Sequence, residues 1–340
     1  MRGVPLLVGL AASAALMTLP ALAAEYHFER VAVIRLDGNT GHGDITTFDP
    51  SNGMLYVSMA KNGLNVVDTH TDRVVKYIDD VPSPNGSDWD ANHVYVAAAD
   101  GPGPLNTNAI VVIDKKTWTE VGRVETQGTS PDWIHVDRKD NLIYVDSDDD
   151  NFMEVYSTGD HPQFKAKWPL YPDRPSTGPD VAMAVPSLHS IFQSDDSYVE
   201  VVNTATGAIE RHMDTGVTLT SKGGTKGEIY DAKNHRLWVG TTNPNPGMFV
   251  LNPDTLAVIK KIPEKGGVDV VAFDPGLGLV YAFEGGAKGF DVYDANTMEH
   301  VAFVSTGIGQ THTGDVDPES HLVFAYCGND RQVMVFKPTR

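Results

Sequence analysis

Seven polar side chains that recur every 41 to 48 residues are the most promising chemical feature of this sequence. Four are aspartates, and the others are an asparagine, a lysine and a histidine: Asp44, Asn85, Asp132, Asp180, Lys226, Asp269 and His312. Converging carboxylates repel one another and raise one another's pKa unless a cation or a bound ligand lies among them. If the fold gathers the seven, they predict a site for a metal ion, a small ligand or a protein partner. The alternative is that these aspartates only accept backbone hydrogen bonds in turns.

Two further acids and two metal-binding residue types lie near this set in the sequence. Glu228 and Asp315 follow members of the set by two or three positions, so we expect them at the same place. Imidazole, carboxylate and thiolate groups together suit Zn, Cu or Fe-type ions. The candidate ligands for such an ion are His42, Asp44, His312, Asp315 and Cys327. The alternative makes the two histidines exposed loop residues and the cysteine a small buried one.

A second candidate metal site is a calcium-like spacing of three aspartates. Asp146, Asp148 and Asp150 occupy the first, third and fifth positions of such a loop, but Asn151 replaces the glycine expected at the sixth. Ser157 replaces the acidic residue at the twelfth position, so the sequence excludes an EF-hand. A looser Ca²⁺ site on a hairpin loop remains an alternative.

The elements that must position these residues are seven copies of one unit. Each copy has a first strand that ends at an aspartate or its equivalent: Asp49, Asp90, Asp137, Val185, Asp231, Asp274 and Asp317. The seven polar residues each lie five positions before these anchors. A short apolar strand follows each anchor, as in Leu55–Val57. A third strand then ends in an Asp/Asn-x-x-Thr turn, as in Val66–Thr71, and a fourth strand follows at once.

Four strands per unit and seven units predict an all-β, seven-bladed β-propeller over residues 24–340. The last unit stops after its third strand at Gln332–Phe336, whereas Val31–Leu36 near the beginning resembles an unpaired fourth strand. We expect these two to pair and close the ring, which hides both sheet edges. The seven polar residues would then surround the channel mouth, where loops such as the one at Glu284 add acids. An open solenoid or two sandwiches is the alternative.

The units resemble the YVTN-repeat family, the periplasmic YncE-like propellers. The resemblance rests on the apolar-Tyr-Val strands at Leu55–Val57, Val94–Val96 and Ile143–Val145, and on the Val-Val-Asp-x-x-Thr pattern at Val66–Thr71. It covers residues 31 to 336 and implies the fold more specifically than an activity. Propellers of this kind serve as binding proteins, enzyme subunits and lactonase-like enzymes, so these three functions are what the resemblance implies.

Composition and the N-terminal residues indicate the class of partner and the location of the protein. A net charge of -19 argues against a general nucleic-acid binder, which needs an excess of Lys and Arg. Arg2, an apolar stretch from Val4 to Leu22 and the small-x-small pattern ending at Ala23 predict a signal peptide over residues 1–23. We therefore expect a periplasmic or secreted protein without a membrane span. The single cysteine excludes an internal disulfide.

Known catalytic motifs are absent from the sequence. It has no dinucleotide fingerprint, Walker loop, Gly-x-Ser-x-Gly or Cys-x-x-Cys-His, so neither a nucleotide cofactor nor covalent haem is expected. The favoured hypothesis is a non-catalytic binding or scaffold propeller, with a divalent ion (Ca, Zn or Cu) as the candidate cofactor. One alternative is a metal-dependent lactonase in which Asp132, Asp180 and Asp269 hold the ion and His312 is the base. Another is an accessory subunit of a periplasmic redox enzyme.

Overall fold

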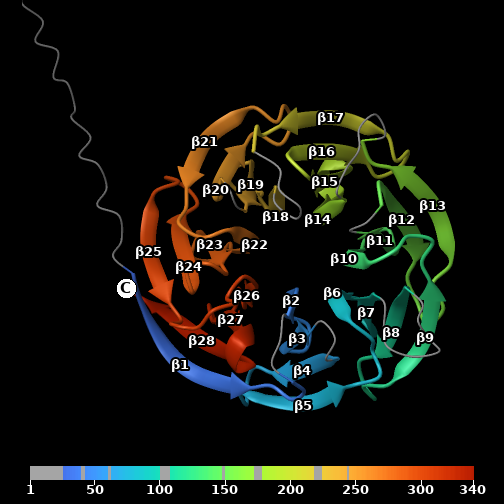
Figure 1. Ribbon diagram of the computed structural model, residues 1–340, viewed down its shortest axis with the longest axis horizontal. Helices are drawn as coiled ribbons and strands as arrows, with labels where there is room; N and C mark the ends of the chain where they lie inside the picture. Colours follow the sequence, from blue (N-terminus) through green and yellow to red (C-terminus); the bar gives the residue numbers. More distant parts are fainter. Residues whose placement is uncertain are drawn as a thin grey trace, which may run out of the picture.

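The computed structural model describes residues 26–39, 43–59, 63–99, 108–147, 150–171, 178–217, 224–242 and 245–340. In these residues the strands form seven four-stranded sheets, which are arranged as blades around a central channel (Figure 1). The predicted seven-bladed β-propeller is therefore confirmed. The helices in the described part are single 3₁₀ turns, η1 (Pro186–Leu188) and η2 (Gly328–Asp330). The predicted signal peptide lies outside the described residues.

Each blade is an antiparallel sheet of four strands, with its first strand nearest the channel and its last at the periphery. Blades 1 and 2 contain β2 (Thr46–Asp49), β3 (Met54–Ser58), β4 (Leu64–Asp68), β5 (Arg73–Ile78), then β6 (Pro84–Trp89), β7 (His93–Ala98), β8 (Ala109–Asp114), β9 (Glu120–Glu125). Blades 3 and 4 contain β10 (Pro131–Asp137), β11 (Leu142–Ser147), β12 (Phe152–Ser157), β13 (Phe164–Pro169), then β14 (Pro179–Val185), β15 (Ser190–Asp195), β16 (Tyr198–Asn203), β17 (Ile209–Asp214). Blades 5 and 6 contain β18 (Thr225–Asp231), β19 (Arg236–Thr241), β20 (Gly247–Leu251), β21 (Val258–Pro263), then β22 (Val268–Asp274), β23 (Leu279–Glu284), β24 (Gly289–Asp294), β25 (His300–Ser305). Blade 7 contains β26 (Gly314–Val316), β27 (Val323–Cys327), β28 (Gln332–Thr339) and the N-terminal strand β1 (His27–Arg35).

The six aspartates among the predicted anchors end or directly follow the inner strands, and their side chains cap the turns that come next. Asp137 accepts a hydrogen bond from the backbone N–H of Lys139 at 2.9 Å, as expected of an aspartate that begins a turn. The turn between third and fourth strands works in the same way, since Asp68 accepts from the backbone N–H groups of His70 and Thr71. Because such capping residues recur along the chain, the repeat can be recognised in the sequence.

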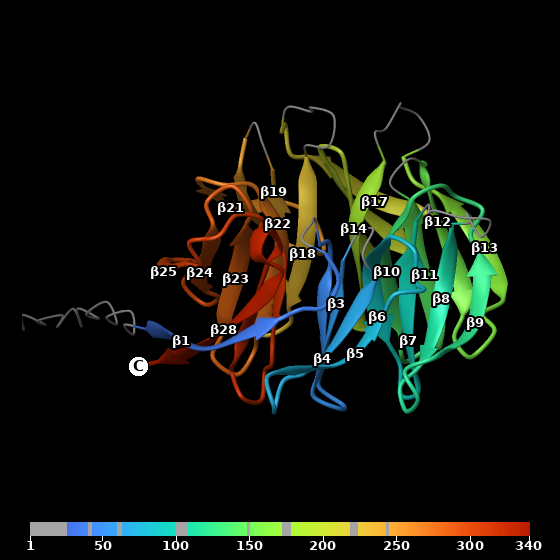
Figure 2. The same ribbon diagram turned by 60° about the horizontal axis from the view of Figure 1, so that its bottom comes forward.

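The N-terminal strand closes the ring as the sequence predicts. β1 pairs with β28 in antiparallel register from His27 opposite Thr339 to Arg35 opposite Gln332, so the strand begins four residues earlier than expected (Figure 2). Blade 1 also bonds to blade 7 through its inner strand. The backbone N–H of Phe48 donates to Asp315 Oδ2 at 2.7 Å.

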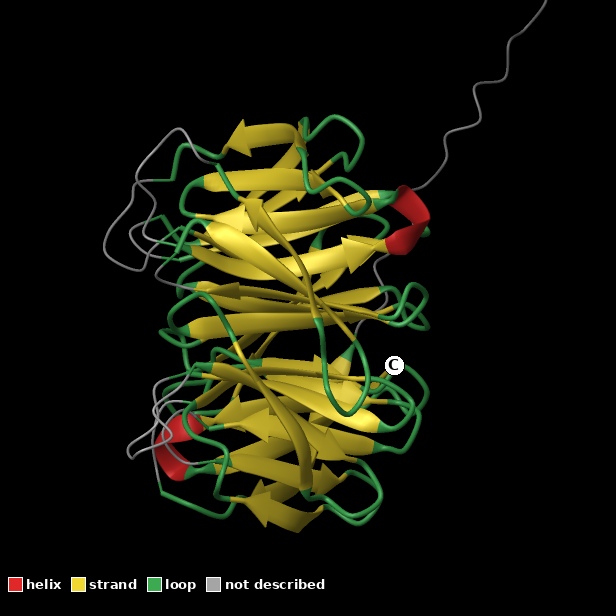
Figure 3. Cartoon of the chain, turned by 90° about the vertical axis from the view of Figure 1, so that its right-hand side faces the viewer, coloured by secondary structure: helices red, strands yellow, loops and turns green. Residues whose placement is uncertain are grey.

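The apolar core is divided among the blade interfaces. Seven clusters of buried side chains lie in the described residues, and each is shared by two successive blades. At the closure, Ile34 and Leu36 pack with Phe48 of blade 1 and with Tyr326 and Val333 of blade 7. In side view the strands run across the thickness of the disc, and the two 3₁₀ turns lie on opposite faces (Figure 3). This rigid frame fixes where each inner strand begins.

Candidate functional site at the channel mouth

Local irregularities in the sheets place the predicted mouth residues. In blade 3 the pairing of the first two strands passes from Pro131 directly to Ile134, so Asp132 lies in a bulge. The equivalent shift falls at the predicted residue in four other blades: Asn85, Asp180, Lys226 and Asp269. Such a bulge bends the strand and changes the direction of its side chains. In blades 1 and 7, Asp44 and His312 precede the inner strand.

Lys226 of blade 5 connects the acidic residues of several blades. Its Nζ donates a hydrogen bond to Asp180 of blade 4, and each side chain is only 16% exposed. Burial acts to lower the pKa of Lys226, but the carboxylates of Asp180, Asp269 and Asp132 outweigh it and raise that pKa above its ordinary value. The chain thus supplies a cation of its own to the converging aspartates. The sequence predicts the convergence but not this pairing.

The remaining mouth residues extend the same ring. His312 Nε2 of blade 7 lies 3.9 Å from Asp269 Oδ2 of blade 6. Asn85 Nδ2 donates to the backbone oxygen of Pro131 at 3.1 Å. The backbone carbonyl of Asn85 accepts from the N–H of Ile45, the residue after Asp44. Contacts between successive blades therefore run through the mouth, and they connect the carboxylates of Asp132, Asp180 and Asp269 with the ammonium of Lys226 and the imidazole of His312.

Glu228 and Asp315 lie below the mouth, on the wall of a cavity inside the channel. This cavity measures about 290 Å³ and every blade contributes to its lining. Burial raises the pKa of Asp315 to about 7, although the N–H groups of Phe48 and Val316 donate to its carboxylate. Burial also raises the pKa of Glu228 well above its ordinary value, against the effect of a hydrogen bond from Ser194. Glu228 is thus a buried residue of the cavity wall, and Asp315 is a half-buried one.

The cavity also holds charged and aromatic residues that sequence reasoning missed. The guanidinium of Arg138 lies 3.6 Å from the ring centre of Trp89 and pairs with Asp88. Burial lowers the pKa of His135 on the same wall, against the effect of the nearby Asp88, which acts to raise it. Their positions in the sequence could have indicated them, because each lies within two residues of the anchor Asp90 or Asp137. A largely apolar pocket with a few fixed polar groups is typical of a ligand site.

The candidate transition-metal ligands that the structure describes do not form one cluster. Of the five, Asp44, His312, Asp315 and Cys327 are described, and no three of these bring ligand atoms within 4.8 Å of one another. Cys327 is fully buried in the apolar interface of blades 6 and 7, and this burial raises the pKa of its thiol. His42 lies outside the described residues, so the metal prediction stays a prediction.

The candidate calcium spacing is only partly described, because Asp148 lies outside the described residues. Asp146 is buried and accepts hydrogen bonds from the N–H of Trp133 and from Gln193 Nε2, both at 3.0 Å. Asp150 accepts from the backbone N–H of Thr129 at 2.7 Å. The two described aspartates thus act as local acceptors that hold the strands of blade 3 to their neighbours.

Comparison with solved structures shows the fold and nothing finer. The β-propeller domain of Cps50 (Swd1) from Myceliophteria thermophila is similar with a TM-score of 0.73 and 12% identity, over 92% of this chain and 99% of that one. A chain of the mitotic checkpoint complex is similar with a TM-score of 0.76 and 9% identity, over 95% and 99% of the two chains. The sequence matches no protein-family model and no curated protein, so the YVTN-repeat resemblance stays a prediction.

The described residues contain no helix that is long and apolar enough to span a membrane.

Proposed function

We propose that this propeller is a non-catalytic binding protein whose mouth receives a positively charged group of its ligand. The observation that carries the proposal is the arrangement around Lys226, where one ammonium faces the carboxylates of Asp132, Asp180 and Asp269. With Asp44 the mouth has four carboxylates for one lysine, which leaves an excess of negative charge. A charged opening with low-dielectric walls attracts ligands of the opposite sign.

The position of Lys226 also favours binding over metal-assisted hydrolysis. In a lactonase-like site the carboxylates of Asp132, Asp180 and Asp269 would have to bind the ion and polarise a carbonyl through it. Here Asp180 already pairs with the ammonium of Lys226, and the other two carboxylates add to the field that holds it. The residues that the enzymatic alternative needs are therefore engaged by a group of the chain itself.

The bearer of the positive charge is a metal ion, a small cationic molecule or a basic segment of a protein partner. A basic protein segment gains support from the fold, because one structural neighbour is a chain of the mitotic checkpoint complex. If residues 1–23 act as a signal peptide, the partner would be met in the periplasm or outside the cell. Sequencing the N-terminus of exported protein tests this location, and an intact Met1 in that protein would contradict it.

The binding proposal is tested by titrating three probes into the protein: Ca²⁺, spermidine and an arginine-rich peptide. We expect the probe that matches the ligand class to bind, to weaken as salt rises, and to lose affinity several-fold on Asp269→Asn. Asp254→Asn is the matched control, because this exposed aspartate pairs with His235 at the periphery of blade 5. Failure of all three probes to bind, or equal affinity in the two variants, would overturn the proposal.

A further inference from the structure

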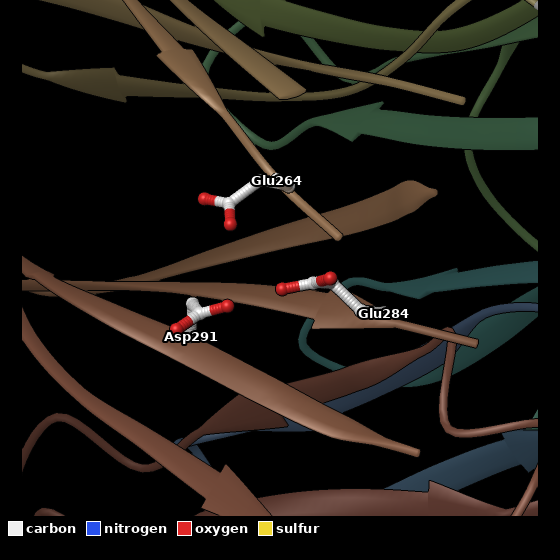
Figure 4. A group of neighbouring side chains, drawn as sticks. All are labelled: Glu264, Glu284 and Asp291. Carbon is white, nitrogen blue, oxygen red and sulfur yellow. The ribbon is translucent and has the colours of Figure 1, made fainter. Parts of the chain in front are cut away.

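Three carboxyl groups, none of them among the seven predicted mouth residues, meet at the interface of blades 5 and 6, where Glu284 pairs with Val268 next to Asp269. They belong to Glu264, Glu284 and Asp291, and their ligand atoms all lie within 4.8 Å of one another (Figure 4). We call these three residues the carboxylate cluster. It is the one group of three potential metal ligands found among the described residues.

Elements of two blades build this cluster. Glu264 follows β21, the outer strand of blade 5, whereas Glu284 ends β23 and Asp291 lies in β24 of blade 6. Glu284 pairs with Gly289 and Asp291 with Ala282, so the two acids are diagonal neighbours on one face of the sheet. The repeat does not place these residues at one common position, which is why their proximity is not visible in the sequence.

The backbone forms a close cradle for Glu284. The N–H of Gly266 donates to Glu284 Oε2 at 2.6 Å. A Cβ at Gly266 would lie 2.9 Å from that oxygen and 2.7 Å from the backbone nitrogen of Ala287, so only glycine fits without a shift. The loop from Glu264 to Gly266 is thus shaped around the Glu284 carboxylate.

The negative charge of the cluster has no lysine or arginine partner among the described residues. Glu284 is fully buried, and its Oε1 has no hydrogen-bond donor in the described part of the chain. The hydroxyl of Tyr293 donates to Glu264, and the imidazole of His300 contacts Asp291. A buried carboxylate oxygen without a donor is costly, so this site requires either a bound proton or a cation.

The pKa values of the two glutamates show the same requirement. Burial, together with the neighbouring Asp291 carboxylate, raises the pKa of Glu264 to about 8. Burial and contact with Asp291 raise the pKa of Glu284 to about 9. A cation bound beside these two glutamates would favour their ionised forms.

An open cavity gives access to the cluster. It measures about 580 Å³ and its lining includes Glu264, Asp291, Tyr293, His300 and Glu299. The space beside the carboxylates admits an ion together with the water molecules that complete its coordination. Contact with His300 also holds the Asp291 carboxylate in a fixed orientation, as groups around metal ligands commonly do.

We propose that the carboxylate cluster binds a divalent hard cation, with Ca²⁺ as the best fit. All three donors are carboxylate oxygens, which Ca²⁺ accepts at 2.3–2.6 Å in flexible geometry, and no thiol lies among them to select a softer metal. The bound ion would link the connection after β21 to β23 and β24. It therefore joins blade 5 to blade 6 and stabilises their interface.

Calorimetric titration and thermal unfolding with Ca²⁺ test this proposal in the full-length mature protein. We expect one Ca²⁺ per chain that Asp269→Asn does not remove, and a melting temperature that rises with Ca²⁺ concentration, because an ion that binds only the folded state stabilises it. Glu284→Gln should reduce the affinity at least tenfold. Without Ca²⁺ the same variant should melt at or above the wild-type temperature, because the amide can donate where the carboxylate lacks a donor, and this shows that it folds.

Two control variants separate this site from its surroundings. Glu299→Gln changes an exposed acid that lines the same cavity but pairs with Lys260, and it should leave Ca²⁺ affinity unchanged. Asp269→Asn alters the mouth and should leave this Ca²⁺ binding intact whatever becomes of the proposed mouth function. A wild-type protein that binds no Ca²⁺, or a Glu284→Gln variant that retains full affinity, would overturn the proposal.

Discussion

Lys226 is the residue that gives the mouth its chemistry. The sequence identifies it as one of seven equivalent positions and predicts that acids surround the channel there. Its pairing with Asp180, rather than with Asp132 or Asp269, depends on how the bulges in neighbouring blades aim these side chains. The spacing of residues in the sequence does not show in which direction their side chains point. The predicted need for a cation is thus met, at least in part, by the chain.

We expect Lys226→Met to destabilise the propeller by about 3 kcal/mol, because it leaves the mostly buried Asp180 carboxylate without its partner. Adding Asp180→Asn to this variant should restore most of the stability, since the uncompensated charge is then removed. Urea unfolding of the two single variants and the double variant measures the coupling. Additive losses would show that the pair contributes nothing.

Glu228 should make the stability depend on pH. Its pKa is raised in the folded state, so between its ordinary value near 4.5 and the raised value the folded protein binds more protons than the unfolded chain. The free energy of unfolding should therefore fall as the pH rises above 4.5. Glu228→Gln should remove this part of the slope, which urea midpoints across the pH range would show. Parallel curves for the variant and the wild type would contradict the burial of an acid at this site.

At the scale of elements, the sequence predicts the strands better than the sites. Aspartates and asparagines that cap turns repeat in every unit, so strand ends such as Asp49 and Asp137 are legible without a structure. Glu284 was expected among the acids of the mouth; it pairs with Val268, next to Asp269, and its carboxylate lies with those of Glu264 and Asp291. That grouping needs the register of β23 with β24 and the path of the loop after β21, which residue types alone do not determine.

The closing strand offers a matched test within two adjacent residues. Ile34 is 2% exposed and packs into the interface of blades 7 and 1, whereas Val33 is 44% exposed on the opposite side of β1. Ile34→Ala should cost about 2–5 kcal/mol, because it opens a cavity in that interface. Val33→Ala should change stability by less than about 0.5 kcal/mol. Equal effects of the two substitutions on the melting temperature would argue against the pairing of β1 with β28.

At the scale of the whole molecule, the ring of blades brings equivalent residues of the repeated units together at the channel mouth. Each blade packs on each of its two neighbours through a separate apolar cluster. The first residues of every inner strand are therefore held at the channel. Closure brings residues 46–48 beside residues 313–315, more than 260 positions apart in sequence. The sequence predicts this closure because the last unit stops after its third strand and the N-terminal segment resembles a fourth strand.

The central claim is that the mouth uses an excess of carboxylates over Lys226 to take up a positive charge. It is tested most directly by the affinity of the tightest-binding cationic probe for Lys226→Met, Asp132→Asn and the Lys226→Met/Asp132→Asn double variant. We expect tighter binding when the lysine is removed and weaker binding when the aspartate is removed. The double variant, whose net charge is unchanged, should bind with an affinity near that of the wild type. Affinities that shift in the same direction in both single variants, or do not shift at all, would contradict it.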